Sequence, residues 1–353
     1  MPTAVAPWLL TRLDRGRQQA LRALGPVARP YLRDRERRVV AVALLGLSLS
    51  FGLTGFAPML LLSFGPIVLG IPHLFADFRY LVFRPRWHRH TASAIAVGLP
   101  LLIAGWTSDP AWGMLAVVGA TAVVPGKRGR RALSFAAAVC LMAVAWRWPN
   151  PFRLVLAHSH NLVALGLWAT WRPGSPRRWW PIFAFSALYT AILLGIFQGI
   201  VPRNASLAGW EHALAPGWPH PSRWVLAFAF AQSVHYAVWL RWIPEDDRAQ
   251  FTPRSFSASW RAALKDAGSA AVYATLASTV TLIGWAFLDV DASRDAYLRF
   301  AQFHAYLELA AIGAGWVVQG PPHSSDSSAS SPSACRSGNR TDTGMGIPAQ
   351  GES

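Results

Sequence analysis

The stretch Gly70-Ile71-Pro72-His73-Leu74-Phe75-Ala76-Asp77 lies within a long run of mostly apolar residues, 59–82. At about 1.5 Å per residue, a helix of this length crosses the ~30 Å hydrocarbon core of a bilayer. Ionisable side chains are costly at membrane depth and mark functional positions there. Because residues four apart share a helix face, His73 and Asp77 predict a buried polar site on a membrane helix.

The rest of the chain repeats this apolar pattern. Hydrophobic residues make up 53% of it and charged residues 14%, and there are 18 tryptophans. We therefore predict an all-α fold, a polytopic bundle of about ten transmembrane helices, or about eight if the third and fourth segments form a re-entrant hairpin. The predicted spans are 39–57, 59–82, 92–106, 111–125, 132–148, 152–171, 180–201, 223–243, 268–288 and 296–318.

Arginines alternate between the loops and so predict the orientation. They are dense before the first span and in every second loop after it, which places both termini in the cytoplasm and the protein in a bacterial inner (plasma) membrane. The predicted regions are a basic interfacial segment (1–38), a transmembrane domain (39–319) and a disordered cytoplasmic tail (320–353). Topology and the lipid bilayer account for the net charge of +16, so we predict no nucleic-acid partner.

Tryptophans flank many of the spans and are interpreted as anchors at the membrane interface. This group includes Trp87, Trp171, Trp179, Trp180, Trp239 and Trp242. The exterior loop 202–222 is interpreted either as a lid or as a surface segment.

Five histidines lie in predicted spans that all run in the same direction. They are His73, His158, His160, His235 and His304. Counted from the predicted outer ends of their spans, they differ in depth by roughly 9–12 Å. Neutral imidazole is a common metal ligand, so these residues are predicted to hold a metal ion, with non-haem Fe(II) favoured and copper or zinc as alternatives.

A histidine that binds a metal usually passes its second ring nitrogen to a polar partner. The spacing predicts that Asp77 orients His73 and that Glu308 orients His304. Asn161 and Gln232, each three residues from a histidine, are assigned the same role. The alternative is that the histidines and acids only form hydrogen bonds between helices.

Two segments resemble the Brp/Blh family of bacterial and archaeal membrane β-carotene dioxygenases. Gly70-Ile71-Pro72-His73 followed by Asp77 is similar to the family element G-x-P-H-G-x-x-D, with Leu74 in place of its second glycine. Phe303-His304 followed by Glu308 is similar to its late P-H element. The resemblance implies a polytopic helical fold, Fe(II) bound by His73 and His304, dioxygen as oxidant, and cleavage of a carotenoid to an aldehyde.

Three functional classes follow from these residues. The first is a metal-dependent oxygenase that takes a lipophilic substrate and dioxygen. The second is a transporter or proton-relay protein that uses the buried His, Asp and Glu side chains without a metal. A haem b protein is disfavoured, because paired-haem bundles separate their two ligand levels by most of the bilayer.

Overall fold

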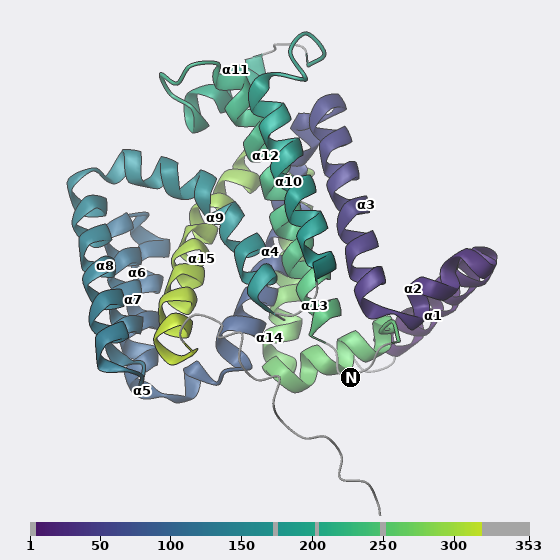
Figure 1. Ribbon diagram of the computed structural model, residues 1–353, viewed down its shortest axis with the longest axis horizontal. Coiled ribbons are helices and arrows are strands. Elements are labelled where there is room, and N and C mark those ends of the chain that lie inside the picture. The colour runs from purple at the N-terminus through teal and green to yellow at the C-terminus, as the bar shows by residue number, and fades with distance from the viewer. Residues whose placement is uncertain (1–4, 172–175, 202–204, 248–251, 320–353) are drawn as a thin grey trace, which may run out of the picture. The chain divides into compact units, whose positions relative to one another are not determined.

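The computed structural model describes residues 5–171, 176–201, 205–247 and 252–319. All regular structure in these ranges is helical, which confirms the predicted all-α class (Figure 1). The predicted tail 320–353 lies outside the described residues.

Each of the ten predicted spans falls on a helix. The helices are α1 (Val5–Ala23), α2 (Arg29–Arg33), α3 (Arg35–Phe56), α4 (Gly65–Asp77), α5 (Thr91–Ser93), α6 (Leu99–Thr107), α7 (Pro110–Val123), α8 (Arg128–Arg147), α9 (Pro149–Trp171), α10 (Trp179–Leu194), α11 (Ala205–Leu214), α12 (Pro221–Ala237), α13 (Ile243–Asp246), α14 (Phe256–Ala286) and α15 (Val290–Gln319). Three π-helical segments extend α4 and α12: Leu60–Phe64 (η2), Phe78–Phe83 (η3) and Val238–Trp242 (η7).

Within the described ranges, four helices are long and apolar enough to cross a membrane. They are Arg35–Phe56, Leu60–Phe83, Arg128–Arg147 and Phe256–Ala286. In α8 and in α14, only 11% of the most apolar 18-residue stretch is buried, so both helices expose apolar side chains. Thr91–Thr107 and Pro110–Val123 are shorter apolar helices. These features suggest membrane association, and the count of ten spans stays a prediction.

Two predicted span boundaries are wrong for local reasons. The span 180–201 was predicted to be one helix, but α10 ends at Leu194 because Gly195 has a φ of 94°, a conformation that favours glycine and ends helices. The last span was predicted to start at residue 296, but α15 starts at Val290. The side chain of Asp289 accepts a hydrogen bond from the Ala292 N–H (2.9 Å), which supports this earlier start.

A kink divides α14 into two parts. Gly268, with a φ of 83°, interrupts the helical backbone, and the two parts run in different directions in Figure 1. The first part contacts α1. The Asp14 carboxylate of α1 accepts hydrogen bonds from the N–H groups of Phe256 (2.6 Å) and Ser257 (3.2 Å) and from the Ser257 hydroxyl (2.7 Å). The amphipathic N-terminal segment is therefore fixed to the start of α14.

We expect Asp14→Asn to loosen this contact. Burial raises the pKa of the Asp14 carboxyl, but hydrogen bonds from Ser257 and Phe256 outweigh it and hold the pKa below its usual value. A lowered pKa means that the charged form stabilises the contact above about pH 4 and that this stabilisation is lost as the pH falls below it. We expect trypsin to cleave α1 faster in Asp14→Asn than in the wild type at neutral pH. Cleavage should be unchanged in the exposed control Asp295→Asn.

Candidate metal centre

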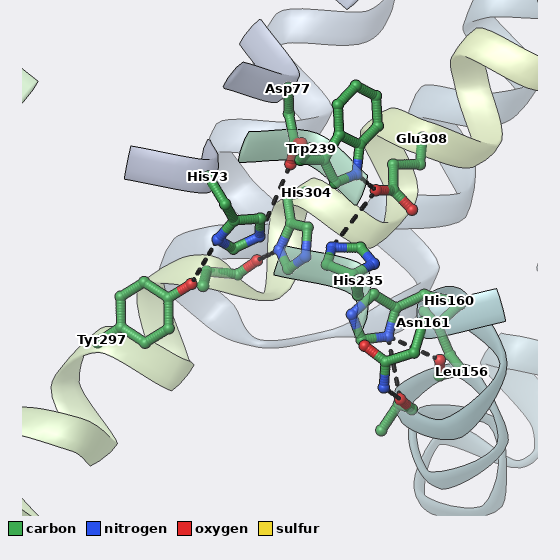
Figure 2. A network of polar contacts seen from close by, with 12 residues as sticks. His73, Asp77, Leu156, His160, Asn161, His235, Trp239, Tyr297, His304 and Glu308 are labelled. Carbon is green, nitrogen blue, oxygen red and sulfur yellow. Dashed lines mark hydrogen bonds and ion pairs between the residues drawn. The ribbon is translucent and has the colours of Figure 1, made fainter. Parts of the chain in front are cut away.

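Four histidines from four helices meet inside the bundle. His73 is on α4, His160 on α9, His235 on α12 and His304 on α15 (Figure 2). These helices form a closed ring of contacts, since both α12 and α15 pack against α4 and against α9. The ring centroids of His73 and His160 each lie 4.9–5.2 Å from those of His235 and His304. Residues far apart in sequence thus build one polar cluster.

The predicted difference in depth is not observed, because the helices start at different residues than predicted. His73 lies 13 residues after Leu60, where its helix begins, and His235 lies 14 after Pro221. His304 also lies 14 residues after the start of its helix, because α15 begins at Val290. The three side chains thus lie at nearly equal distances along their helices, and their ring centroids are 4.9–5.8 Å apart.

Three of the histidines are placed to hold a metal ion together. His73, His235 and His304 each offer one ring nitrogen, and these nitrogens all lie within 4.8 Å of one another. The side chains are almost fully buried. Metal–nitrogen bonds of about 2.0–2.1 Å in tetrahedral geometry place ligand nitrogens roughly 3.3 Å apart. Small side-chain rotations would therefore complete a three-histidine site.

Two of the rings carry their proton on the nitrogen that points to their own helix. His304 Nδ1 donates to the Ala301 carbonyl, and His160 Nδ1 is bonded to the carbonyls of Leu156 (3.2 Å) and Ala157 (3.0 Å). A carbonyl oxygen only accepts, so in both neutral rings Nδ1 is the donor. Nε2 of both rings then keeps its lone pair, which is the form that binds metals.

Tyr297 holds His73 from the opposite side. The Tyr297 hydroxyl lies 3.4 Å from His73 Nδ1, which leaves Nε2 facing the other histidines (Figure 2). The ring of Tyr297 lies directly against α4 at Gly70, where an added Cβ would come within 2.3 Å of it. Gly70 is therefore required for this close approach, three residues before the histidine that the tyrosine contacts.

We expect Gly70→Ala to destabilise the protein by about 1–3 kcal/mol, because the added methyl group overlaps the Tyr297 ring. In thermal unfolding, the double variant Gly70→Ala with Tyr297→Ala should lose less stability than the sum of the losses of the two single variants. Gly52→Ala on α3 is the matched control, since an added methyl group there would meet no neighbouring atom within 4 Å, and it should be neutral or stabilising. Equal losses at the two glycines would contradict this account.

Two fully buried carboxylates accompany the histidines. Asp77 Oδ2 lies 3.9 Å from His73 Nε2, as the i,i+4 spacing predicts. Glu308 was predicted to orient His304 on its own helix, but it instead contacts His235 of α12, with Oε1 3.7 Å from His235 Nε2. The same Oε1 accepts a hydrogen bond from Trp239 Nε1 (2.7 Å). Helix packing, which the sequence does not reveal, selects this partner.

His158 does not join the cluster. Its Nε2 donates to the Leu214 carbonyl (2.9 Å), and its ring packs against Trp218 and Phe228. Residues two apart point in directions about 200° apart on a helix, so His158 and His160 cannot face the same site. His158 instead ties α9 to the end of α11, a helix within the segment that was predicted to be an exterior loop.

The cluster lies at a cavity of about 770 Å³. All four clustered histidines line it, together with Asn161 and Gln232, the two predicted polar partners. Most other lining residues are apolar and come from α9, α11, α12, α15 and the segment between α11 and α12, among them Leu154, Trp210, Leu214, Trp218, Phe228 and Leu298. Asp77 and Glu308 do not line this cavity, so the histidines separate it from the carboxylates.

Sequence reasoning missed Tyr297 and misread Trp239. Tyr297 lies seven residues before His304, so the two share a helix face, and this spacing was the available signal. Trp239 and Trp242 were interpreted as interfacial anchors, but both are buried: Trp239 binds Glu308 and Trp242 packs on Trp168. The side chain of Trp171 lies outside the described residues.

Comparison with known proteins finds no matching family model, no matching curated protein and no matching solved structure, so the buried histidine cluster that could hold a metal is the basis for any functional assignment.

Proposed function

We propose that this protein is a membrane-embedded oxygenase that binds non-haem Fe(II) through histidines and acts on a lipophilic substrate. The observation that carries the proposal is the approach of His73, His235 and His304 to within 4.8 Å of one another beside an apolar cavity. A metal on three imidazoles keeps coordination positions free for dioxygen or substrate. The cavity supplies a water-poor space for an apolar molecule.

The candidate ligands are imidazoles and carboxylates, which suit iron, copper or zinc, and not the thiolates of a sulfur-ligated site. The free Cys140 is exposed, and the cluster consists of imidazoles with two carboxylates nearby. Among these metals, iron is the one implied by the resemblance to the carotenoid-cleaving family. Cleavage of one carbon–carbon double bond by one dioxygen molecule gives two aldehydes, with both oxygen atoms in the products, so no further reductant is needed.

The test is the metal content of the detergent-purified protein, measured by elemental mass spectrometry after growth with iron. We expect about one iron per chain in the wild type and loss of iron and activity together in His73→Ala. His90→Ala, in an exposed position, is the matched control and should keep both. Activity is followed with a carotenoid as the loss of polyene absorbance and the appearance of an aldehyde by chromatography.

The alternative is a transporter or proton relay without a metal. It would use the buried carboxyl groups of Asp77 and Glu308 to carry protons or ions. The same measurement separates the two functions. Wild-type protein without stoichiometric metal, whose substrate flux depends on Asp77 or Glu308, would replace the oxygenase proposal. Soret absorption in the purified protein would instead indicate haem b.

A further inference from the structure

Asp77 and Glu308 approach the histidine nitrogens that face the cluster. The hydroxyl of Tyr297 lies at Nδ1 of His73, so Nε2 is the nitrogen left for a metal, and this is the nitrogen 3.9 Å from Asp77 Oδ2. A carboxylate that only orients a ligand contacts the nitrogen that is remote from the metal. At His73 that remote position belongs to Tyr297, which leaves Asp77 beside the cation position.

The second carboxylate has a similar arrangement. Glu308 Oε1 lies 3.7 Å from His235 Nε2 and accepts the Trp239 N–H, while Glu308 Oε2 has no hydrogen-bond partner. Both oxygens of Asp77 also lack a hydrogen-bond partner, although the side chain is fully buried. Buried polar atoms are normally satisfied, so these three oxygens point to a missing electrostatic partner.

A divalent cation would balance the charge of two ionised carboxylates. Three neutral imidazoles around a divalent ion leave a charge of +2 inside the bundle, where an uncompensated charge is strongly disfavoured. Two ionised carboxylates cancel that charge. Within the described ranges, the ion-pair contacts of Asp77 and Glu308 are with histidines and not with arginine or lysine.

We propose that Asp77 and Glu308 belong to the cation site itself, as its two negatively charged members, and make it selective for a divalent over a monovalent ion. This inference rests on the proposed metal site and adds to it the charge that the site requires. The carboxylates lie on the side of the site away from the cavity, because the clustered histidines line the cavity and the two acids do not. The substrate side of the cation thus carries neither of the two carboxylates.

The test compares amide variants of the two acids. Asp77→Asn and Glu308→Gln keep an oxygen that accepts a hydrogen bond but remove the charge. We expect each to weaken binding of Fe²⁺ and Mn²⁺ by more than about 100-fold, beyond the ~10–100-fold effect of partners that only orient ligands, and to retain Cu⁺. Glu211→Gln on α11 is the matched control and should bind as the wild type does. Anaerobic titration of the purified protein measures all three ions.

Each outcome decides a different point. Amide variants that bind Fe²⁺ and Mn²⁺ within tenfold of the wild type would overturn the charge role and leave the histidine site intact. Wild-type protein that binds none of the three ions would overturn the proposed function as well. If the amide variants do not fold, the wild type alone still tests the inference. Mn²⁺ prefers carboxylate oxygens, so it must bind at one ion per chain. A wild type that binds Cu⁺ but not Mn²⁺ would reject the acids as members of the site.

Discussion

Chelating the metal of the proposed site is expected to destabilise the wild-type protein by about 4 kcal/mol, and His235→Ala is expected to abolish this effect. An ion that binds only the folded state at 1,000 times its dissociation constant contributes about this much. His235 is 1% exposed, and neither of its ring nitrogens has a hydrogen-bond partner. Its replacement therefore removes a proposed metal ligand without breaking a hydrogen bond of the ring.

The measurement is thermal unfolding in detergent, with and without chelator and after iron is added back. His158→Ala is the matched control, because this histidine binds the Leu214 carbonyl rather than the cluster. It should lose about 1 kcal/mol for the missing hydrogen bond and keep the full response to the chelator. A wild type that is insensitive to chelation, or equal responses of the two variants, would contradict the assignment of His235 as a ligand.

The sequence predicted the helices well because apolar runs and loop arginines depend on local composition. The sequence also identified the four clustered histidines as site residues, because a histidine within an apolar run can be recognised without knowing its depth in the membrane. The two-residue spacing of His158 and His160 already showed that only one of them could face the site, but the structure was needed to show that it is His160. The level of His304 depended on where α15 starts, and a helix start is among the least certain features of a sequence.

The partners across helices were not predictable in the same way. Glu308 has His304 as its neighbour in sequence, yet it contacts His235 and Trp239, both on the segment that follows Pro221. Such pairs depend on how helices rotate against one another, and a single sequence carries no record of that rotation. For the same reason, the arginines that predicted topology gave no indication of the acidic residues that neutralise them.

Those acidic residues gather in one short segment. Glu245, Asp246 and Asp247 follow Pro244 and form ion pairs with arginines from three other parts of the chain. The pairs join Glu245 to Arg38 (2.7 Å), Asp246 to Arg178 (2.5 Å) and Asp247 to Arg84. A segment predicted only as the end of a span and the start of a loop thus connects the ends of several helices.

Glu245→Ala is expected to destabilise the protein by about 3–5 kcal/mol, because it leaves the buried guanidinium of Arg38 without its carboxylate. The side chains of Arg38 and Glu245 are only 6% and 4% exposed. The Nε of Arg38 also donates to Glu245 at 2.8 Å, so the pair is held by more than charge. Replacing both residues together, as Arg38→Met with Glu245→Leu, should cost much less than Glu245→Ala, since no buried charge remains unpaired.

A pair on α15 whose carboxylate is exposed provides the control for this experiment. Asp291, whose side chain is 78% exposed, pairs with Arg294, and Asp291→Ala should change stability by no more than about 1 kcal/mol. Thermal unfolding of the variants in one detergent gives the comparison. If Glu245→Ala unfolds at the same temperature as Asp291→Ala, the acidic segment does not hold the helix ends together. A large loss that the double replacement recovers would instead show that the cost lies in the arginine left without its carboxylate and not in lost packing.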